Sequence, residues 1–391
     1  MNADVFDLVI LGGGCAGLSL ARELSNTLSW NQRTLIIESR TNYSNDHSWC
    51  FWTPKDPILR QTLEPMIDNT WEQWRFSGVG FSKVHTSLGK YYCHISANSF
   101  YQHALSSVYN HKDIELKCGK KAIIIKNCGS GSTIQLDDGS CVYASRVIDT
   151  RPIIYQDASQ AQVWQIFFGY EIETQQDFFD DATVGLMENL TPQPQATEFI
   201  YTLPFTKKRA LIELTQFSSK LFNPMELVDP LNRYLAQHIG KNKFRILRSE
   251  YACLPMGLKY ELRSTSQHYH YAGISAGAIR PATGYAFIRI QQWAKICASK
   301  LSQREKSLPI IGSTPLVKAM DKIFLRALHD KPSIGVELFQ VLAERVSGQS
   351  LVRFLMDEAK AEDYFKVIMA LPKFRFLLYS LNINHLLLPA R

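Results

Sequence analysis

Residues 6–28 read FDLVILGGGCAGLSLARELSNTL, and this stretch decides the fold. Its first six residues form an apolar run rich in strand formers, and the leucines after the glycines recur at helical spacing. TLIIES at 34–39 indicates a second buried strand. Residues 6–39 therefore predict a strand–helix–strand unit with a glycine-rich turn between the first strand and the helix.

The glycine spacing is typical of dinucleotide-binding turns. Gly12 permits the tight turn, Gly14 lets the backbone approach a pyrophosphate, and Gly17 lets the helix pack on the strand. Glu38 comes 21 residues after Gly17, where it can bond ribose hydroxyls and disfavours a 2′-phosphate. A glycine-rich turn that binds nothing is the alternative. The motif leaves FAD and NAD open, but its place ahead of a long mixed chain favours FAD, and a second such motif for NADPH is missing.

Composition places the chain among globular proteins. With 391 residues, 46% hydrophobic and 20% charged, it is long enough for two domains or one elaborated domain. An aromatic content of 12% argues against disorder. We find no uncharged apolar run of about 18 residues, so no membrane-spanning helix is predicted. The first residues lack the basic segment of a secretory signal, so a cytoplasmic location is expected.

Charge and cysteine usage restrict the partners only weakly. The net charge of +7 is compatible with anionic lipid or nucleic acid, but a plain solvated surface is the simplest interpretation, and no nucleic-acid partner is expected. The eight cysteines contain no CxxC pair, which indicates free thiols in a reducing compartment. His268 and His270 have no cysteine nearby, so no metal site is expected.

Downstream segments alternate between sheet and helix patterns. Residues 121–149 predict a small antiparallel sheet, because AIIIKN, TIQL and CVYA are separated by turn signals. Residues 272–301 predict a strand, a glycine-rich turn and a helix that begins near Thr283, and helical periodicity dominates from about 315 onward. Further strands are expected at 163–172, 197–203 and 209–217, the last two joined by the hairpin PFTKK.

Four segments follow one another at a recognisable spacing. They are DHSWCF at 46–51, QIFFGYE at 165–171, FIYTLP at 199–204 with LIE at 211–213, and PATGY at 281–285. Each alone is a modest signal. The ordered set resembles the bacterial lycopene β-cyclase family over nearly the whole chain.

The resemblance implies an α/β fold of the para-hydroxybenzoate-hydroxylase class of flavoproteins. A Rossmann-type FAD-binding region would comprise 1–45, 95–155 and 265–305, a β-sheet substrate region 46–94 and 156–264, and a helical C-terminal region 306–391. The resemblance also implies bound FAD that works in its reduced form without net redox change, with NAD(P)H or another donor maintaining that form. The implied substrate is a polyene with linear ψ-ends.

Cyclising a terminal isoprene unit needs an acid that protonates an alkene, a dry pocket that stabilises a tertiary carbocation, and a base. Glu213 lies in an apolar run, where burial would disfavour its ionised form and keep it protonated near neutral pH. A strand-surface carboxylate is the alternative. Aromatic faces attract cations, so nearby rings are candidates to stabilise the carbocation. Packing in a plain core is the alternative for them. These rings are Phe167, Phe168, Phe199, Tyr201 and Phe205.

Leu214 departs from the family pattern, which has an acid directly after this glutamate. If that acid assists proton transfer, the chain would make one ring rather than two, use another polyene, or cyclise another prenylated molecule. Glu188 falls where the resemblance implies an acid after Met187, so it is the second acid–base candidate, with a surface carboxylate as the alternative.

The PATGY turn can offer backbone N–H groups to the pyrimidine edge of a flavin, so its cofactor candidates are Pro281, Thr283, Gly284 and Tyr285. Gly273-Ile274 stands where many flavoproteins of this class have Gly-Asp, a departure that the lycopene cyclases share. Asp149 resembles the aspartate of the family's V-I-D-G-R and is a further cofactor candidate, with a strand-end cap as the alternative. His47 and Trp49 border either the flavin or the substrate path, or pack in a loop. Cys50 is assigned no catalytic role.

Three alternatives differ in class from a cyclase. A monooxygenase would consume NADPH and oxygen, a prenyl reductase would add two hydrogens per double bond, and a non-catalytic protein would bind polyene or flavin unchanged. An insoluble substrate implies peripheral membrane contact, for which the apolar, cationic segment 365–391 is a candidate, or else a helical core element. A monomer or weak homo-oligomer is expected.

Overall fold

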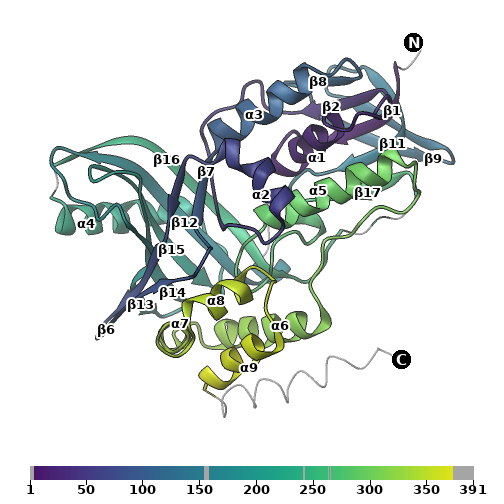
Figure 1. Cartoon of the computed structure of the whole chain (residues 1–391). Helices are drawn as coiled ribbons and strands as arrows, with labels where there is room; N and C mark the ends of the chain where they lie inside the picture. The colour runs from purple at the N-terminus through teal and green to yellow at the C-terminus, as the bar shows by residue number, and fades with distance from the viewer. Residues whose placement is uncertain (1–3, 154–157, 241–242, 263, 265, 373–391) are drawn as a thin grey trace.

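A computed structural model describes residues 4–153, 158–240, 243–262, 264 and 266–372. Figure 1 shows two large sheets side by side, with helices on the outer face of one and a group of C-terminal helices below the other. Between the sheets lies a small three-stranded sheet of order β3–β7–β4. Its strands are β3 (Ser48–Trp52), β7 (Tyr92–Ser96) and β4 (Asn69–Trp71).

The first large sheet is built on the strand–helix–strand unit of the N-terminus. β1 pairs in parallel with β2 on one side and with β11 on the other, and β11 also pairs in parallel with β17. The order is β8–β2–β1–β11–β10–β9, with β10 and β9 antiparallel as the turn signals predicted. The strands are β1 (Asp4–Leu11), β2 (Thr34–Glu38), β8 (Ile114–Cys118), β9 (Ala122–Cys128), β10 (Gly131–Leu136), β11 (Cys141–Asp149) and β17 (Tyr269–Tyr271).

Three helices cover one face of this sheet: α1 (Cys15–Ser25), α3 (Ala97–Tyr109) and α5 (Phe287–Ser302). Ile10 of β1 packs in the apolar cluster beneath them, whereas Val9 and Leu11 pack in a separate cluster on the other side. Burial of both faces is typical of parallel sheets and explains the unbroken apolar run of β1. Short helices α2 (Pro57–Leu63) and η1 (Glu64–Met66) lead from β3 to β4.

The second large sheet has the order β16–β12–β15–β14–β13–β5–β6. Its pairs are antiparallel except that β5 runs parallel to β13. The helix α4 (Val228–His238) packs on one face through an apolar cluster. The strands are β5 (Gln73–Gly78), β6 (Phe81–Thr86), β12 (Ala161–Thr174), β13 (Thr183–Gln193), β14 (Ala196–Pro204), β15 (Arg209–Ser218) and β16 (Phe244–Leu258).

C-terminal helices lie against the opposite face of this sheet and extend from its β16–β12 side to its β13–β5 side (Figure 1). Leu328 of α6, Leu338 of α7 and Leu351 of α8 share one apolar core with sheet residues such as Trp74 and Phe217. The helices are α6 (Pro315–Asp330), α7 (Ile334–Arg345), α8 (Gly348–Leu355) and α9 (Ala361–Ala370). The remaining short turns are η2 (Ala158–Gln160), η3 (Pro224–Leu227) and η4 (Ile274–Ala276).

The segment 272–301 differs from the sequence prediction. The strand β17 ends at Tyr271, before this segment begins. The helix α5 begins at Phe287 rather than near Thr283. Gly284 has φ of +74°, a left-handed conformation that no helix contains, so the PATGY residues form a turn ahead of the helix. In segment 365–391, α9 ends at Ala370, and residues 373–391 lie outside the described residues. The division of the chain into three regions stays a prediction.

None of the helices in the described ranges between residues 4 and 372 is long and apolar enough to cross a bilayer. The eight cysteines, all of them within those ranges, are free thiols.

Candidate functional site

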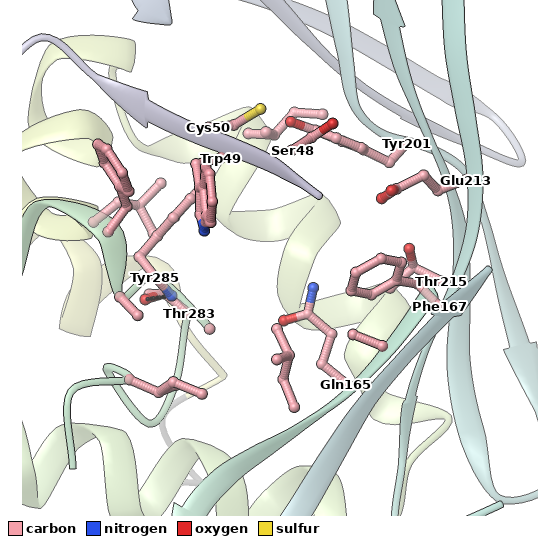
Figure 2. A pocket seen from close by; sticks show the side chains of 18 of the residues that line it. Ser48, Trp49, Cys50, Gln165, Phe167, Tyr201, Glu213, Thr215, Thr283 and Tyr285 are labelled. Atoms are coloured by element: carbon pink, nitrogen blue, oxygen red, sulfur yellow. Dashed lines mark hydrogen bonds between the residues drawn. The ribbon is translucent and has the colours of Figure 1, made fainter. Parts of the chain in front are cut away.

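A cavity of about 360 Å³ lies between the second sheet, strand β3, the PATGY turn and helices α7 and α8. Figure 2 shows Glu213, Phe167 and Thr215 along one wall, with Trp49, Thr283 and Tyr285 on the other side. Most of the lining is apolar or aromatic; it includes Phe76, Leu186, Met187, Phe199, Phe217, Phe339, Leu342, Leu351 and Leu355. Such a lining suits a hydrocarbon ligand.

Glu213 projects from β15 into this cavity (Figure 2). Only 6% of the residue is exposed. Burial raises the pKa of the Glu213 carboxyl well above its usual range, and the negative charge of Glu250 raises that pKa further. Both effects favour the neutral form of the Glu213 carboxyl, which is the protonation state that a proton donor needs.

The register of three strands brings Glu250 to Glu213. Gly169 of the central strand β12 pairs with Glu213 of β15 on one side and with Glu250 of β16 on the other. A side chain at Gly169 would stand between the two carboxyls, because an added Cβ would lie 2.6 Å from the Cγ of Glu213. Glycine leaves this space open, so the two carboxyls come within hydrogen-bonding reach across the middle strand.

Glu250 is held by cationic and hydroxyl donors. Arg248 donates to it through one guanidinium nitrogen, and the Oγ of Ser48 donates to its Oε2 at 2.7 Å. Arg248 also donates to Ser48 at 2.9 Å and to Glu171 at 2.6 Å. Arg209 is the second cation on Glu171. Arg248 and Arg209 thus form ion pairs with Glu171 and Glu250. Glu213 has no such ion pair among the described residues.

Sequence reasoning missed Glu250, because the surrounding FRILRSEY contains no apolar run, and five of its eight residues are exposed. A weak signal was available. Arg248, Glu250, Ala252 and Leu254 alternate along β16, and the last three of these line the cavity. Alternation would have placed Glu250 on an inward face, but not beside Glu213.

Hydroxyl groups and a thiol line the wall next to Glu213. The Tyr92 and Tyr201 hydroxyls lie 2.9 Å apart, and Tyr285 hydrogen-bonds with Tyr92. Burial raises the pKa values of these three phenols and of the Cys50 thiol above their usual ranges. All four groups therefore stay protonated at neutral pH and make poor bases.

The glycine-rich turn has the geometry that its spacing predicted. Gly12 has φ of +94° and so requires glycine, and a Cβ on Gly17 would lie 1.9 Å from the Gly12 carbonyl oxygen. A Cβ on Gly14 would meet nothing within 4 Å, so the backbone there faces open space. Glu38 accepts from the Gly13 N–H at 2.7 Å and from Arg40, which holds its carboxylate at the turn.

The cavity continues from Glu213 to this turn, since its lining includes Cys15 at the start of α1 and Ile274, Thr283 and Gly284 on the opposite side. Gln165 of β12 lies between the two ends (Figure 2), and its Oε1 is buried without a hydrogen-bond partner among the described residues. An orphaned buried acceptor indicates a missing donor. A flavin carries N–H groups, so the residues present fit that cofactor.

Comparison with known proteins identifies the family. Residues 7–379 match the sequence model of a family described as "Lycopene cyclase protein". The chain belongs to the lycopene cyclase family. It is 24% identical to the lycopene β-cyclase of Pseudescherichia vulneris over 79% of this chain and 76% of that protein. It is also 24% identical to the chloroplastic lycopene β-cyclase of Arabidopsis thaliana. That alignment covers 77% of this chain and 61% of the Arabidopsis protein.

Solved structures with the same fold include a protein described as a flavoprotein/dehydrogenase from Cytophaga hutchinsonii, with a TM-score of 0.61 at 12% identity, covering 97% of this chain and all of that one. A geranylgeranyl bacteriochlorophyll reductase-like protein from Thermoplasma acidophilum superposes with a TM-score of 0.60 at 14% identity, covering 99% of this chain and all of that one. A p-nitrophenol 4-monooxygenase from Pseudomonas putida gives 0.60 at 13% identity, covering 96% and 99%. The lycopene cyclase family member described here therefore has the fold of the para-hydroxybenzoate-hydroxylase class, as the resemblance implied.

The chain departs from the lycopene cyclase pattern at Leu214, and this side chain points away from the cavity. Side chains alternate along β15, so Glu213 and Thr215 face the cavity while Leu214 packs in the cluster under α4. Glu188 is also absent from the cavity lining; its carboxylate pairs with Arg75 at 3.1 Å. The structure therefore does not bring the predicted second acid to Glu213, and the place beside it is taken by Glu250.

The other predicted cofactor residues divide into two groups. Thr283, Gly284 and Tyr285 line the cavity, as do His47 and Trp49, whereas Pro281 is half-buried just outside it. Asp149 is fully engaged within the protein: Arg151 donates to both carboxylate oxygens, and the Tyr269 hydroxyl donates at 2.6 Å. Its contacts are those of a strand-end anchor for Arg151, and its cofactor contact stays a prediction.

We expect His94 of β7 to make stability depend on pH. It is 3% exposed, packs on Phe205, and has no hydrogen-bond partner in the described part of the chain. Burial lowers its pKa to about 4, against the opposing attraction of Asp68. Because the unfolded histidine binds a proton near pH 6.5 and the folded one does not, stability falls as pH drops from about 6.5 towards about 4.

We expect acidification from pH 7 to pH 5 to cost about 2 kcal/mol through this one residue. Urea unfolding at both pH values measures the loss, with His94→Gln as the comparison. The variant should lose about 2 kcal/mol less than the parent on acidification. An equal loss in both proteins would contradict the assignment.

Proposed function

We propose that this chain binds FAD and closes the linear ψ-ends of lycopene, or of a related polyene, to β-rings without net redox change. One observation carries the proposal: a neutral, buried carboxylic acid, Glu213, faces an apolar and aromatic cavity that runs to a dinucleotide-binding turn. Membership of the lycopene cyclase family supports the choice of a polyene as substrate. The reaction makes the enzyme an isomerase.

Glu213 begins the reaction by donating its proton to the terminal double bond of the polyene. The proton forms a new C–H bond, and the resulting tertiary cation lies among aromatic faces that attract positive charge, including Phe167, Tyr201 and Trp49. The neighbouring double bond then attacks the cation and closes the six-membered ring. Proton loss from a ring carbon restores the double bond, so atoms and electrons balance without an external oxidant.

The glycine-rich turn and the N-terminus of α1 would hold the FAD pyrophosphate, and Glu38 would hold the ribose. Thr283, Gly284 and Gln165 would contact the flavin ring. When bound in its reduced form, the flavin supplies an electron-rich ring that favours positive charge next to it, and NAD(P)H is the proposed donor that maintains this form. The apolar lining of the cavity, including residues of helices α7 and α8, would limit the access of water to a carbocation.

Peripheral membrane contact is part of the proposal, because a long hydrocarbon reaches the cavity from lipid rather than from water. Helix α9 supplies a candidate surface: Phe365, Ile368 and Met369 are exposed and Lys366 lies among them. An exposed apolar face with a flanking cation is typical of helices that lie on a bilayer.

The decisive experiment incubates the purified chain with FAD, NADPH and lycopene in liposomes without oxygen, followed by chromatography and mass spectrometry. We expect a product of unchanged mass whose absorption is shifted to shorter wavelength, because ring closure twists the terminal double bonds out of conjugation. A mass gain of two hydrogens would replace the proposal with a prenyl reductase. Lycopene that is bound but unconverted would point to a binding protein or another polyene. A parallel sample with oxygen tests for a monooxygenase through added oxygen mass.

A further inference from the structure

Ring closure needs a base, and the geometry restricts which group can serve. Among the cavity-lining residues that the structure describes, the titratable groups are Cys15, His47, Cys50, Tyr92, Tyr201, Glu213, Glu250 and Tyr285. The thiols and phenols have raised pKa values and keep their protons. Glu213 is the acid. The Nδ1 of His47 lies 3.1 Å from the Asp46 carboxylate. This carboxylate raises the histidine pKa, although burial opposes the shift, so His47 favours its protonated form.

We propose that Glu250 is the base, and that Glu213 and Glu250 act as one acid–base pair that holds a single proton between them. This inference rests on the proposed function and adds a second catalytic residue to it. Glu213 gives its proton to the terminal alkene. Glu250 then receives the proton that leaves the ring carbon, while the C–H electron pair becomes the new ring double bond. Transfer of that proton from Glu250 to Glu213 restores the starting state.

The two carboxyls differ in their partners, and this difference assigns their roles. Glu250 forms an ion pair with Arg248 and accepts a hydrogen bond from the Ser48 hydroxyl at 2.7 Å. Glu213 has the Glu250 carboxyl as its neighbour and no cation in ion-pair contact within the described residues. Two adjacent buried carboxylates share one proton, because a second negative charge at this distance is costly.

After Glu213 has given up its proton, both carboxyls carry a negative charge in a cavity whose lining is mostly apolar. That state is unfavourable, so the pair regains a proton readily, and the nearest source is the cationic ring. Gly169 allows the two carboxyls to approach each other, because it places no side chain between the strands that carry Glu213 and Glu250. Charged and titratable groups that face the pair from the surrounding elements are Arg248, Glu171, Arg209, His47, Cys50, His94 and Tyr201.

Infrared spectroscopy of the flavin-loaded protein tests the shared proton without any turnover. The C=O stretch of a protonated carboxyl is followed from about pH 5 to about pH 9 in the parent, Glu213→Gln and Glu250→Gln. We expect a buried acid band that disappears in Glu213→Gln. In Glu250→Gln the band should remain but titrate at least about one pH unit lower, a tenfold weaker hold on the proton, because the neighbouring anion is gone. An unchanged midpoint would overturn the pairing.

Product analysis tests the role of Glu250 as base. Glu250→Gln should reduce ring closure at least about 100-fold, and the residual product should contain a larger share of rings with a displaced double bond, because the proton then leaves from another carbon. Glu250→Asp should restore part of the rate. Residual product with the parent's double-bond position and ratio would refute the base assignment. The control is Glu173→Gln, which removes a carboxylate from β12 that pairs with Arg245 on the surface.

Gly169→Ala offers a second route to the same answer. Its Cβ would push against Glu213 and separate the carboxyls without removing either one. The acid band should again titrate at lower pH, and loss of activity without that shift would count against the pair. Flavin retention and thermal unfolding of every variant identify any that fail to fold. If the parent protein leaves lycopene unconverted, the proposed function fails while the infrared titration still decides whether the pair exists.

Discussion

Replacing Glu213 by glutamine is expected to lower the rate of ring closure by about 10²- to 10⁴-fold, the usual contribution of a positioned acid. Glutamine has nearly the same shape as the protonated acid, so the cavity and its apolar contacts should remain. It has no acidic proton to give to an alkene. The loss should therefore appear in the rate of product formation, while binding of flavin and polyene stays close to that of the parent.

The same change should make the folded chain more stable at neutral pH. The raised pKa of Glu213 means that the unfolded chain releases its proton at pH 7 and the folded chain keeps it, so stability falls as pH rises above about 4.5. Glutamine removes this dependence. We expect a gain of about 1 kcal/mol at pH 7, the scale of other stabilising substitutions, and almost none at pH 4.

Denaturant unfolding at both pH values, together with product analysis in liposomes, checks these two expectations. Glu173→Gln is a matched control on the same sheet, since this carboxylate lies partly exposed against Arg245. It should keep the parent's activity and show no comparable gain in stability. A Glu213→Gln protein that still cyclises at the parent's rate would remove this residue from the mechanism.

Replacing Gly17 by alanine should abolish flavin retention. The new Cβ would lie 1.9 Å from the Gly12 carbonyl oxygen and 3.2 Å from the Thr150 Oγ1, so α1 must move away from the end of β1. Overpacking of this kind typically costs about 1–3 kcal/mol. It also displaces the helix N-terminus that would face the pyrophosphate, so we expect FAD affinity to fall at least about tenfold.

Flavin absorbance after desalting and thermal unfolding with and without added FAD measure both effects. Gly312→Ala serves as control, because its Cβ would meet nothing within 4 Å and its φ lies outside the left-handed region. Gly14→Ala separates fold from cofactor: its Cβ meets open space, so it should fold like the parent and yet bind FAD weakly. Full flavin retention in Gly17→Ala would contradict the nucleotide site.

Much of the site was predictable because local patterns report local structure. The glycines of the first turn require their conformations whatever the rest of the chain does, and Gly12 and Gly17 show the expected tight geometry. The burial of Glu213 was predictable for a related reason, because an acid inside the apolar run of a strand is buried when its neighbours are buried. Only 6% of Glu213 is exposed.

Residue pairs across the sheet were not predictable in this way. Glu188 and Glu250 look alike in the sequence, each an acid on a long strand, yet only Glu250 lines the cavity beside Glu213. The difference lies in strand register, and a shift of one residue would turn each side chain to the opposite face. The same alternation turns Leu214 towards α4, so its departure from the family pattern leaves the cavity wall unchanged.

Local sequence specifies the geometry of the glycine-rich turn and the burial of Glu213, because each depends on residues close together in the chain. Only the tertiary structure places β16 next to β12, sets Gly169 between two glutamates 37 positions apart, and brings Arg248 and Ser48 to Glu250. These contacts depend on which strands pair and in what register, and that follows from how the whole chain buries its apolar surface.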